Sequence, residues 1–335
     1  MKKASIGIDI SKSNFHVCFK IRLEEGKIKI LGTSSFQNNT KGFEELLDWV
    51  DKKNKEDPDP VFVMEATGVY GEDLVYFLHD QDRIASVVLP NRMKGYFKSL
   101  NIKTKTDKID SKIIAEYGIE RRLDIWKPMS SNYKALRELC RELLALKNTR
   151  TKALNQLHAM KYAHGRLGEL VKMKESQIEF YDDNIAELKK HIQLAVESDQ
   201  QLVEKLKKVV SIPGLGFETA VILASETNGF LLFHNIKQVV SYAGLDVSHN
   251  ESGRFRGRSK ISKKGNTKIR QALFMPALTA TVHNQPIKGL YERICEKNPN
   301  IKRKGVVASM RKLLILAYTL WKKDEIFNKE YKWAA

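Results

Sequence analysis

The chain is poor in cysteine and in long apolar runs, and each shortage excludes a class of protein. Its three cysteines, Cys18, Cys140 and Cys295, lie too far apart for a CxxC pair or another zinc-binding spacing. A sparse, odd set of cysteines is typical of a reducing cytoplasm. No apolar run approaches the roughly 18 residues that a membrane span needs, and Met1–Lys12 lacks the apolar segment of a signal peptide. We therefore expect a cytoplasmic protein without a membrane anchor.

Acidic residues are also in short supply. The 40 Asp and Glu residues face 58 Lys and Arg residues, which gives a net charge of +18. Such an excess favours a polyanionic partner, and nucleic acid is the usual one because each neutralised phosphate releases condensed counterions. An anionic membrane surface would require a basic amphipathic anchor or a lipidation signal, and the sequence shows neither. A merely soluble basic protein is the remaining alternative.

The length of 335 residues predicts two or three domains. Residues 1–128 alternate strand and helix patterns, which indicates an α/β domain whose mixed sheet has helices on its faces, in an RNase H-like strand order. The expected strands are Ala4–Ile10, Asn14–Ile21, Lys27–Phe36, Val61–Met64 and Ile84–Leu89, and the expected helices are Gly42–Lys53, Tyr70–His79 and Asp107–Glu120.

Residues 129–206 have a different pattern, with two long helical segments at Asn132–Met160 and Ser176–Val196. Apolar residues step by three and four along the second segment, as in a coiled-coil seam: Ile178, Tyr181, Ile185, Leu188, Ile192 and Ala195. The region His164–Gly168 is the expected reversal between two antiparallel helices. The pair could serve as a spacer within one chain or as a dimerisation element, and the sequence does not decide between them. Residues 207–325 then predict a mainly α-helical third domain.

Four acids in the first domain are candidates for a metal site. Asp9 stands inside an apolar strand, where an ionised side chain is costly unless it is paired or bound to metal. Glu65 ends another apolar strand, and Asp107 and Asp110 lie on one face at a helix start. Carboxylates that converge in this way hold Mg²⁺ or Mn²⁺ for phosphoryl transfer. Alternatively, Asp107 could cap the helix with Asp110 in its first turn, and Glu65 could cap the turn at Gly68.

The last domain offers phosphate contacts and one candidate nucleophile. Gly214 and Gly216 fit a helix-hairpin-helix motif, in which backbone N–H groups approach a phosphate at a helix N-terminus, or an ordinary packing turn. A basic loop follows, and no acid occurs between Ser252 and Tyr291. Cations so dense usually contact phosphates: Arg254, Arg256, Arg258, Lys260, Lys263, Lys264, Lys268 and Arg270. Ser252 opens the loop, where a phosphoryl oxyanion would be stabilised, although a Ser-Gly pair is usually only a turn.

Taken in order, these motifs resemble the DEDD insertion-sequence transposases, which are related to the Piv/MooV DNA invertases and include the bridge-RNA-guided recombinases. The resemblance runs over nearly the whole chain and is carried by short motifs in a fixed order: Gly7-Ile8-Asp9, Glu65-Ala66-Thr67-Gly68, Thr106-Asp107-Lys108-Ile109-Asp110, Ile212-Pro213-Gly214-Leu215-Gly216, Ala243-Gly244-Leu245, Glu251-Ser252-Gly253 and Ile261-Ser262-Lys263-Lys264-Gly265. Ser111 departs from the Ala that this family often has after its last Asp.

The resemblance implies a RuvC-like domain at 1–128, a coiled coil at 129–206 and a transposase domain at 207–325. It implies that Asp9, Glu65, Asp107 and Asp110 bind Mg²⁺ or Mn²⁺, and that Ser252 is a nucleophile that forms a covalent link to DNA. Its implied partners are donor and target double-stranded DNA, a noncoding bridge RNA whose pairing reads sequence, and further copies of the chain in a dimer or tetramer. The implied location is the bacterial nucleoid.

Two other functions fit the same residues. The first is a RuvC-like junction endonuclease, in which water attacks the phosphate and Ser252 is a turn residue, or an invertase that acts without guide RNA. In a nucleic-acid-binding scaffold without catalysis, replacement of Asp9 would change nothing, and the presence of all four acids argues against that alternative.

Overall fold

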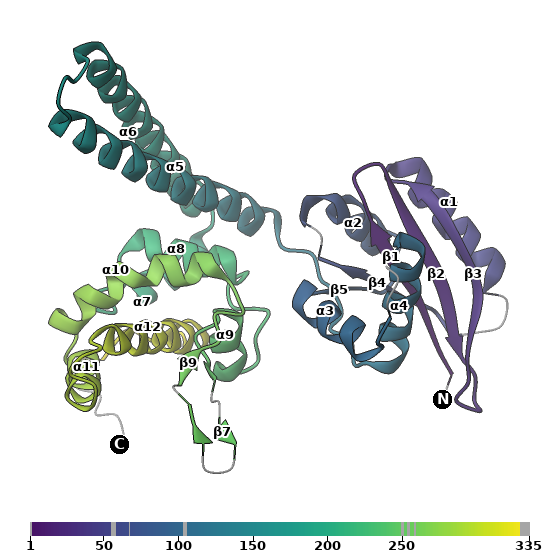
Figure 1. Cartoon of the computed structure of the whole chain (residues 1–335). Helices are drawn as coiled ribbons and strands as arrows, with labels where there is room; N and C mark the ends of the chain where they lie inside the picture. Colours follow the sequence, from purple (N-terminus) through teal and green to yellow (C-terminus); the bar gives the residue numbers. More distant parts are fainter. Residues whose placement is uncertain are drawn as a thin grey trace. The chain divides into compact units, whose positions relative to one another are not determined.

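The chain divides into two compact units, Met1–Pro128 and Met129–Ala335. The computed structural model describes residues 2–54, 58–66, 68–102, 106–248, 251–252, 255–257 and 259–328 (Figure 1). The further division of the second unit near residue 206 stays a prediction.

The first unit is built on a five-stranded mixed sheet with the strand order β3-β2-β1-β4-β5. β1 to β3 form an antiparallel meander, while β4 lies parallel to β1 and β5 parallel to β4. The mixed sheet expected from the sequence is therefore confirmed. The strands are β1 Lys3–Ile10, β2 Asn14–Arg22, β3 Ile28–Gln37, β4 Val61–Glu65 and β5 Ala85–Val88.

Helices cover both faces of this sheet. Ile6, Ile8 and Phe62 pack on one face with the apolar sides of α1 Thr40–Lys53 and α2 Glu72–Asp80. A short 3-10 helix, η1 Gly68–Gly71, precedes α2. The other face, which includes Val63, packs against α3 Pro90–Ser99 and α4 Asp107–Glu120. The sequence pattern does not predict helix α3, because Pro90 resembles the end of a strand, whereas it occupies the first turn of a helix, where its fixed φ fits.

Helix α4 lies directly on the backbone of β1, and two glycines allow this approach. A Cβ atom at Gly7 would lie 2.1 Å from the Ala115 nitrogen and 2.2 Å from the Ser111 oxygen, and one at Gly118 would lie 2.1 Å from the Ser5 hydroxyl. Because side chains alternate along a strand, Ser5, Gly7 and Asp9 share the face that α4 covers. The strand position of Asp9 therefore directs its carboxylate toward α4.

The second unit begins with a long helical hairpin. α5 Ser131–Tyr162 and α6 Gly168–Glu197 run side by side (Figure 1), and the reversal between them falls where the sequence predicts it. Leu157 and Ile178 pack together in the far part of the hairpin, and Arg150 pairs with Asp182 across it. True coiled-coil geometry stays a prediction.

Six further helices and four short strands complete the described part of this unit. One apolar cluster joins Leu143 of α5 and Ile192 of α6 to Leu223, Leu273 and Leu314 of the later helices, so the base of the hairpin shares a core with them. Among the residues that the structure describes, no helix has both the length and the apolar character for a membrane span. The elements are α7 Gln200–Val210, α8 Phe217–Glu226, α9 Ile236–Tyr242, β6 Val247–Ser248, β7 Glu251–Ser252, β8 Phe255–Arg256, β9 Lys260–Ile261, α10 Thr267–His283, α11 Gln285–Lys297 and α12 Arg303–Lys323.

Candidate functional site

Two of the four predicted metal-binding acids end neighbouring parallel strands. In the register of β1 and β4, Ile8 stands opposite Met64, so Asp9 and Glu65 come next on the two strands. Adjacent strands direct opposed residues to the same face, which here is the face covered by α4. The strand pairing therefore brings together two carboxylates that are far apart in the sequence.

The other two acids are in the first turn of α4, above the same strand ends. The side chain of Thr106 caps this helix by accepting a hydrogen bond from the Ile109 nitrogen at 3.3 Å. Asp107 is therefore not the helix cap, and that alternative explanation of its presence is wrong. The Asp110 side chain is buried, with 8% of its residue surface exposed, and both acids lie where the helix dipole favours negative charge.

The acids are close enough to affect the ionisation of Asp9. Burial, followed by the negative charges of Asp110, Asp107 and Glu65, raises the pKa of Asp9 from 3.8 to about 6, and His16 opposes the rise. Repulsion among carboxylates is a usual contributor to such a rise. The other three predicted acids therefore all act electrostatically on Asp9.

The donor set suits a hard divalent cation. Mg²⁺ and Mn²⁺ prefer carboxylate oxygens, and a cation would relieve the repulsion that raises the pKa of Asp9. Within the described residues, however, no three His, Cys, Asp or Glu side chains already lie at metal-ligand spacing. The four acids lie near one another and create a negative charge. Their side chains would have to rotate toward a common point to coordinate an ion.

His16 is absent from the predicted site, although it belongs to the same neighbourhood. It stands opposite Asp9 in the pairing of β1 and β2, and its Nε2 atom lies 3.8 Å from Asp107 Oδ2. The tight turn at Ser11–Asn14 sets this register. Counting outward from that turn is the one signal in the sequence that places His16 beside Asp9.

The predicted nucleophile lies in the second unit, on an arm that we define as residues 246–262. Ser252 is exposed on β7 and pairs with Phe255 of β8, and β6 pairs with β9 at the foot of the arm. Figure 1 shows β7 on an extension that projects from the helices. The side chain of Ser252 is therefore accessible to solvent.

The predicted phosphate-binding cations divide into three groups. Lys260, Lys263 and Lys264 are exposed and Lys268 is half-buried. The guanidinium of Arg270 instead donates to three backbone carbonyls, those of Ala243, Gly265 and Asn266, at 2.8, 3.2 and 3.3 Å, so it serves the structure of the loop. Arg254 and Arg258 and the side chain of Arg256 lie outside the described residues.

The two glycines of the predicted helix-hairpin-helix motif have different surroundings. Gly214 has a φ of +100°, and a Cβ atom there would lie 2.8 Å from the Ala280 side chain of α10, so close packing accounts for this glycine. Gly216 precedes α8 in an exposed position with open space around it. A phosphate contact at either glycine stays a prediction.

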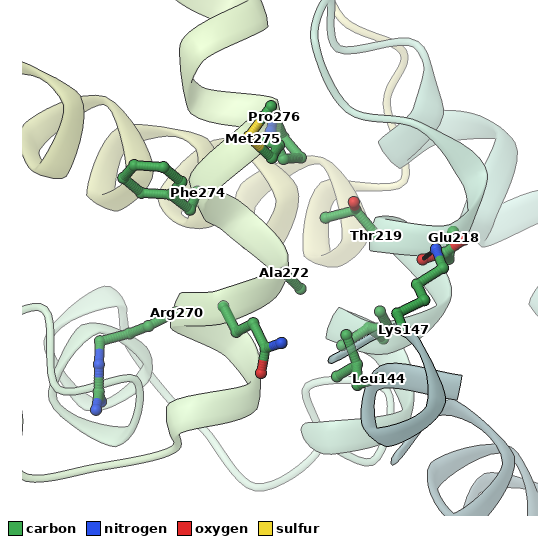
Figure 2. A pocket seen from close by; sticks show the side chains of 11 residues that line it. Leu144, Lys147, Glu218, Thr219, Arg270, Ala272, Phe274, Met275 and Pro276 are labelled. Carbon is green, nitrogen blue, oxygen red and sulfur yellow. Dashed lines mark hydrogen bonds and ion pairs between the residues drawn. The ribbon is translucent and has the colours of Figure 1, made fainter. Parts of the chain in front are cut away.

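A pocket of about 630 Å³ lies between α5, α8 and α10 (Figure 2). Its walls are largely apolar, and Lys147 and Glu218 form an ion pair on one side. None of the predicted catalytic residues lines it. Its lining residues are Leu144, Lys147, Glu218, Thr219, Ile222, Arg270, Gln271, Ala272, Phe274, Met275 and Pro276.

Comparison with known proteins gives two family matches and several relatives. Residues 6–160 match a family described as "Transposase", and residues 206–292 match one described as "Transposase IS116/IS110/IS902 family". Pilin gene-inverting proteins of Moraxella bovis and Moraxella lacunata are each 30% identical over 336 residues, which covers 98% of this chain and 99% of theirs. The transposase of insertion sequence element IS1111A from Coxiella burnetii is 20% identical over 224 residues, or 59% of each chain.

Proposed function

The chain belongs to the IS116/IS110/IS902 family of transposases, and from this premise we propose that it is a recombinase that cuts and rejoins double-stranded DNA. The observation that carries the proposal is the convergence of four acids, with Asp9 and Glu65 at the ends of adjacent parallel strands and Asp107 and Asp110 in the first turn of α4. The raised pKa of Asp9 agrees with this arrangement, because such shifts are common at catalytic sites. The net charge of +18 suits a DNA substrate.

The first unit is proposed to be a RuvC-like domain of the RNase H type. Its strand order, β3-β2-β1-β4-β5 with a meander followed by parallel strands, supports this assignment. So does the position of Asp9 and Glu65 at the ends of adjacent central strands. Asp9, Glu65, Asp107 and Asp110 would hold a divalent cation, Mg²⁺ or Mn²⁺, which when bound supplies positive charge to the phosphoryl oxygens during reaction.

Ser252 is proposed to be the nucleophile. Its hydroxyl oxygen would form an ester bond to a DNA phosphorus atom, while the bond from that phosphorus to a deoxyribose oxygen breaks. The hydroxyl proton would leave Ser252, and the released deoxyribose oxygen would take up a proton. Attack by a deoxyribose hydroxyl of another strand would then reverse these steps and free the serine. Exposed Lys260, Lys263 and Lys264 nearby would contact the phosphates.

The acids and the serine belong to different units of the chain, so the reaction requires them to meet. They would meet within one subunit or between subunits of a dimer or tetramer, and the α5–α6 hairpin, as a coiled coil, would set the geometry. A bridge RNA is proposed to select the DNA by base pairing while basic side chains hold its backbone. The similarity to the two pilin gene-inverting proteins favours a second candidate, a DNA invertase. Such an invertase could act without guide RNA.

Two experiments test these proposals. The first incubates the protein with DNA and Mg²⁺ and looks for a covalent protein–DNA adduct. Ser252→Ala should abolish the adduct, whereas the control Ser248→Ala, an exposed serine of the same arm, should keep it. An adduct that survives Ser252→Ala would exclude Ser252 as the nucleophile.

The second experiment purifies the protein from its host and sequences the RNA that accompanies it. A discrete noncoding RNA from the flanks of the gene would support guidance by RNA. Recombination by an RNA-free preparation would instead favour the invertase.

A further inference from the structure

A carboxylate is buried in the second unit, far along the chain from the four acids. Glu226, the last residue of α8, exposes only 1% of its surface. Burial of an ionised carboxylate is costly unless hydrogen bonds and opposite charge compensate for the lost water. The mechanism proposed above does not use Glu226, so its presence in the core needs another explanation.

Both carboxylate oxygens of Glu226 have strong partners. Arg141 of α5 donates from Nε to Oε1 at 2.6 Å and from its terminal nitrogen to Oε2 at 2.8 Å. Asn266 donates from Nδ2 to Oε2 at 2.7 Å. Burial alone would raise the pKa of Glu226, but the hydrogen bonds from Arg141 and Asn266 outweigh it and hold the pKa below its ordinary value. The carboxylate is therefore ionised, and both of its oxygens accept hydrogen bonds.

Asn266 connects this carboxylate to the start of α10. Its side-chain oxygen caps the helix by accepting from the Lys268 and Ile269 nitrogens at 2.9 and 3.2 Å. Its backbone nitrogen donates to the Tyr242 carbonyl at 2.7 Å, and the Tyr242 hydroxyl donates to the Glu226 carbonyl at 3.1 Å. One asparagine therefore links α8, α9 and α10.

The same place is where the two ends of the Ser252 arm meet. The Lys263 nitrogen donates to the Gly244 carbonyl at 3.1 Å, and the Ser262 nitrogen donates to the Asp246 carbonyl at 2.9 Å. A Cβ atom at Gly265 would lie 2.3 Å from the Tyr242 carbonyl oxygen and 2.6 Å from the Gly244 nitrogen. The chain entering the arm and the chain leaving it are thus in backbone contact, beside Asn266.

We propose that Glu226 is a positioning residue, which acts through Asn266 to fix the base of the Ser252 arm against α5. An apolar side chain of similar size would stabilise the core as well as an ion pair does. Glu226 differs from an apolar side chain in that its hydrogen bonds to Arg141 and Asn266 have a defined geometry. These bonds fix the position of the base of the arm. An effect of Glu226 on catalysis rests on the proposed role of Ser252 as nucleophile. An effect of Glu226 on the structure of the arm does not.

The test compares two asparagine caps. Asn266→Ser keeps a capping oxygen at α10 but removes the donor to Glu226. Asn235→Ser is the matched control, because Asn235 caps α9 by accepting from the Gln238 nitrogen at 3.0 Å and has no bond to Glu226 in the described structure. Glu226→Gln, which keeps the shape of the side chain and removes its charge, is the second test variant. All variants are made in the full chain.

Four quantities are measured on each variant: amide hydrogen exchange, the rate of adduct formation, DNA affinity and the melting temperature. Amide hydrogen exchange at Ser262, Lys263 and Asn266 reports on the base of the arm, and we expect it to become about tenfold faster in Asn266→Ser and Glu226→Gln only. The rate of the covalent adduct at saturating DNA should fall about tenfold to a hundredfold in the same two variants, since small displacements of a nucleophile are costly. DNA affinity should stay within about twofold, because the exposed lysines are unchanged.

Every outcome decides the proposal. The proposal would be wrong if the three amides exchanged equally fast in Asn266→Ser and Asn235→Ser. It would also be wrong if these two variants lost the same adduct rate and the same melting temperature. If the adduct persists in Ser252→Ala, the proposed nucleophile fails, yet the exchange data still decide the role of Glu226. If the wild-type protein forms no adduct, exchange alone decides it.

Discussion

Replacement of Asp9 by Asn should stabilise the metal-free protein at neutral pH while it removes metal binding. Burial and the nearby acids raise the pKa of Asp9 from 3.8 to about 6. The folded protein therefore binds this proton more tightly than the unfolded chain does. The contribution of Asp9 to stability is complete below about pH 4 and is lost as the pH rises through about 6.

The size of the effect follows from that rise. At about 1.4 kcal/mol for each pH unit, it corresponds to roughly 3 kcal/mol at most, and solvent screening of a partly accessible carboxylate reduces this to about 1–2 kcal/mol. Asn cannot ionise, so Asp9→Asn should raise the melting temperature at pH 8 by roughly 3–8 °C in the presence of a chelator. At pH 4 the two proteins should melt at nearly the same temperature.

The assay is differential scanning calorimetry of the full chain between pH 4 and pH 8, with chelator, Mg²⁺ or Mn²⁺. Addition of either cation should raise the melting temperature of the wild-type protein and leave Asp9→Asn unchanged. Asp48→Asn, a change at an acid in the middle of α1, away from the four acids, is the control and should follow the wild type. Identical pH profiles for Asp9→Asn and the wild type would refute the reasoning, because they would mean that the acids do not interact.

Three further predictions concern other parts of the chain. Gly7→Ala should cost about 3 kcal/mol or more of unfolding free energy, because its Cβ atom would overlap the backbone of α4. Gly95→Ala, which meets nothing within 4 Å in helix α3, should instead stabilise by up to about 1 kcal/mol in the same denaturant titration. Ser252→Ala should leave the melting temperature unchanged, because this serine is exposed. Lys263→Ala and Lys264→Ala should each make the negative slope of log K against log salt for DNA binding shallower by about 0.9, and an unchanged slope would show that the lysine contacts no phosphate.

Much of the first unit is predictable because its strands are short apolar runs bounded by clear turns. Asp9 is conspicuous because an acid interrupts such a run, and in the structure burial and three neighbouring acids raise its pKa. Helix α3 escapes prediction because only Met93 and Tyr96 are buried among polar neighbours, so its periodicity is weak and Pro90 resembles a strand end. His16 escapes prediction because its place opposite Asp9 depends on strand register, which the sequence indicates only through the position of the turn at Ser11–Asn14.

The second unit is harder to predict from the sequence. The sequence of a dense run of cations does not show which guanidinium binds phosphate and which binds the backbone. In the structure, Arg270 donates hydrogen bonds to three backbone carbonyls. Glu226 does have a signal in the sequence. It comes two residues after the apolar run Ala220–Ala224, and an acid so close to a buried apolar segment requires compensation, as Asp9 does within its strand. Its partners Arg141 and Asn266 come from distant segments and cannot be inferred locally.

The meeting of the arm's two ends over Gly244 and Gly265 has a consequence for how such proteins diverge. A segment whose entry and exit lie side by side can grow, shrink or be exchanged without altering the helices that carry it. Substitutions on the arm between Asp246 and Ser262 would then accumulate independently of the core, while Tyr242, Gly265 and Asn266 would resist change. The same junction offers an engineer two adjacent points at which the arm of one recombinase could be grafted onto the body of another.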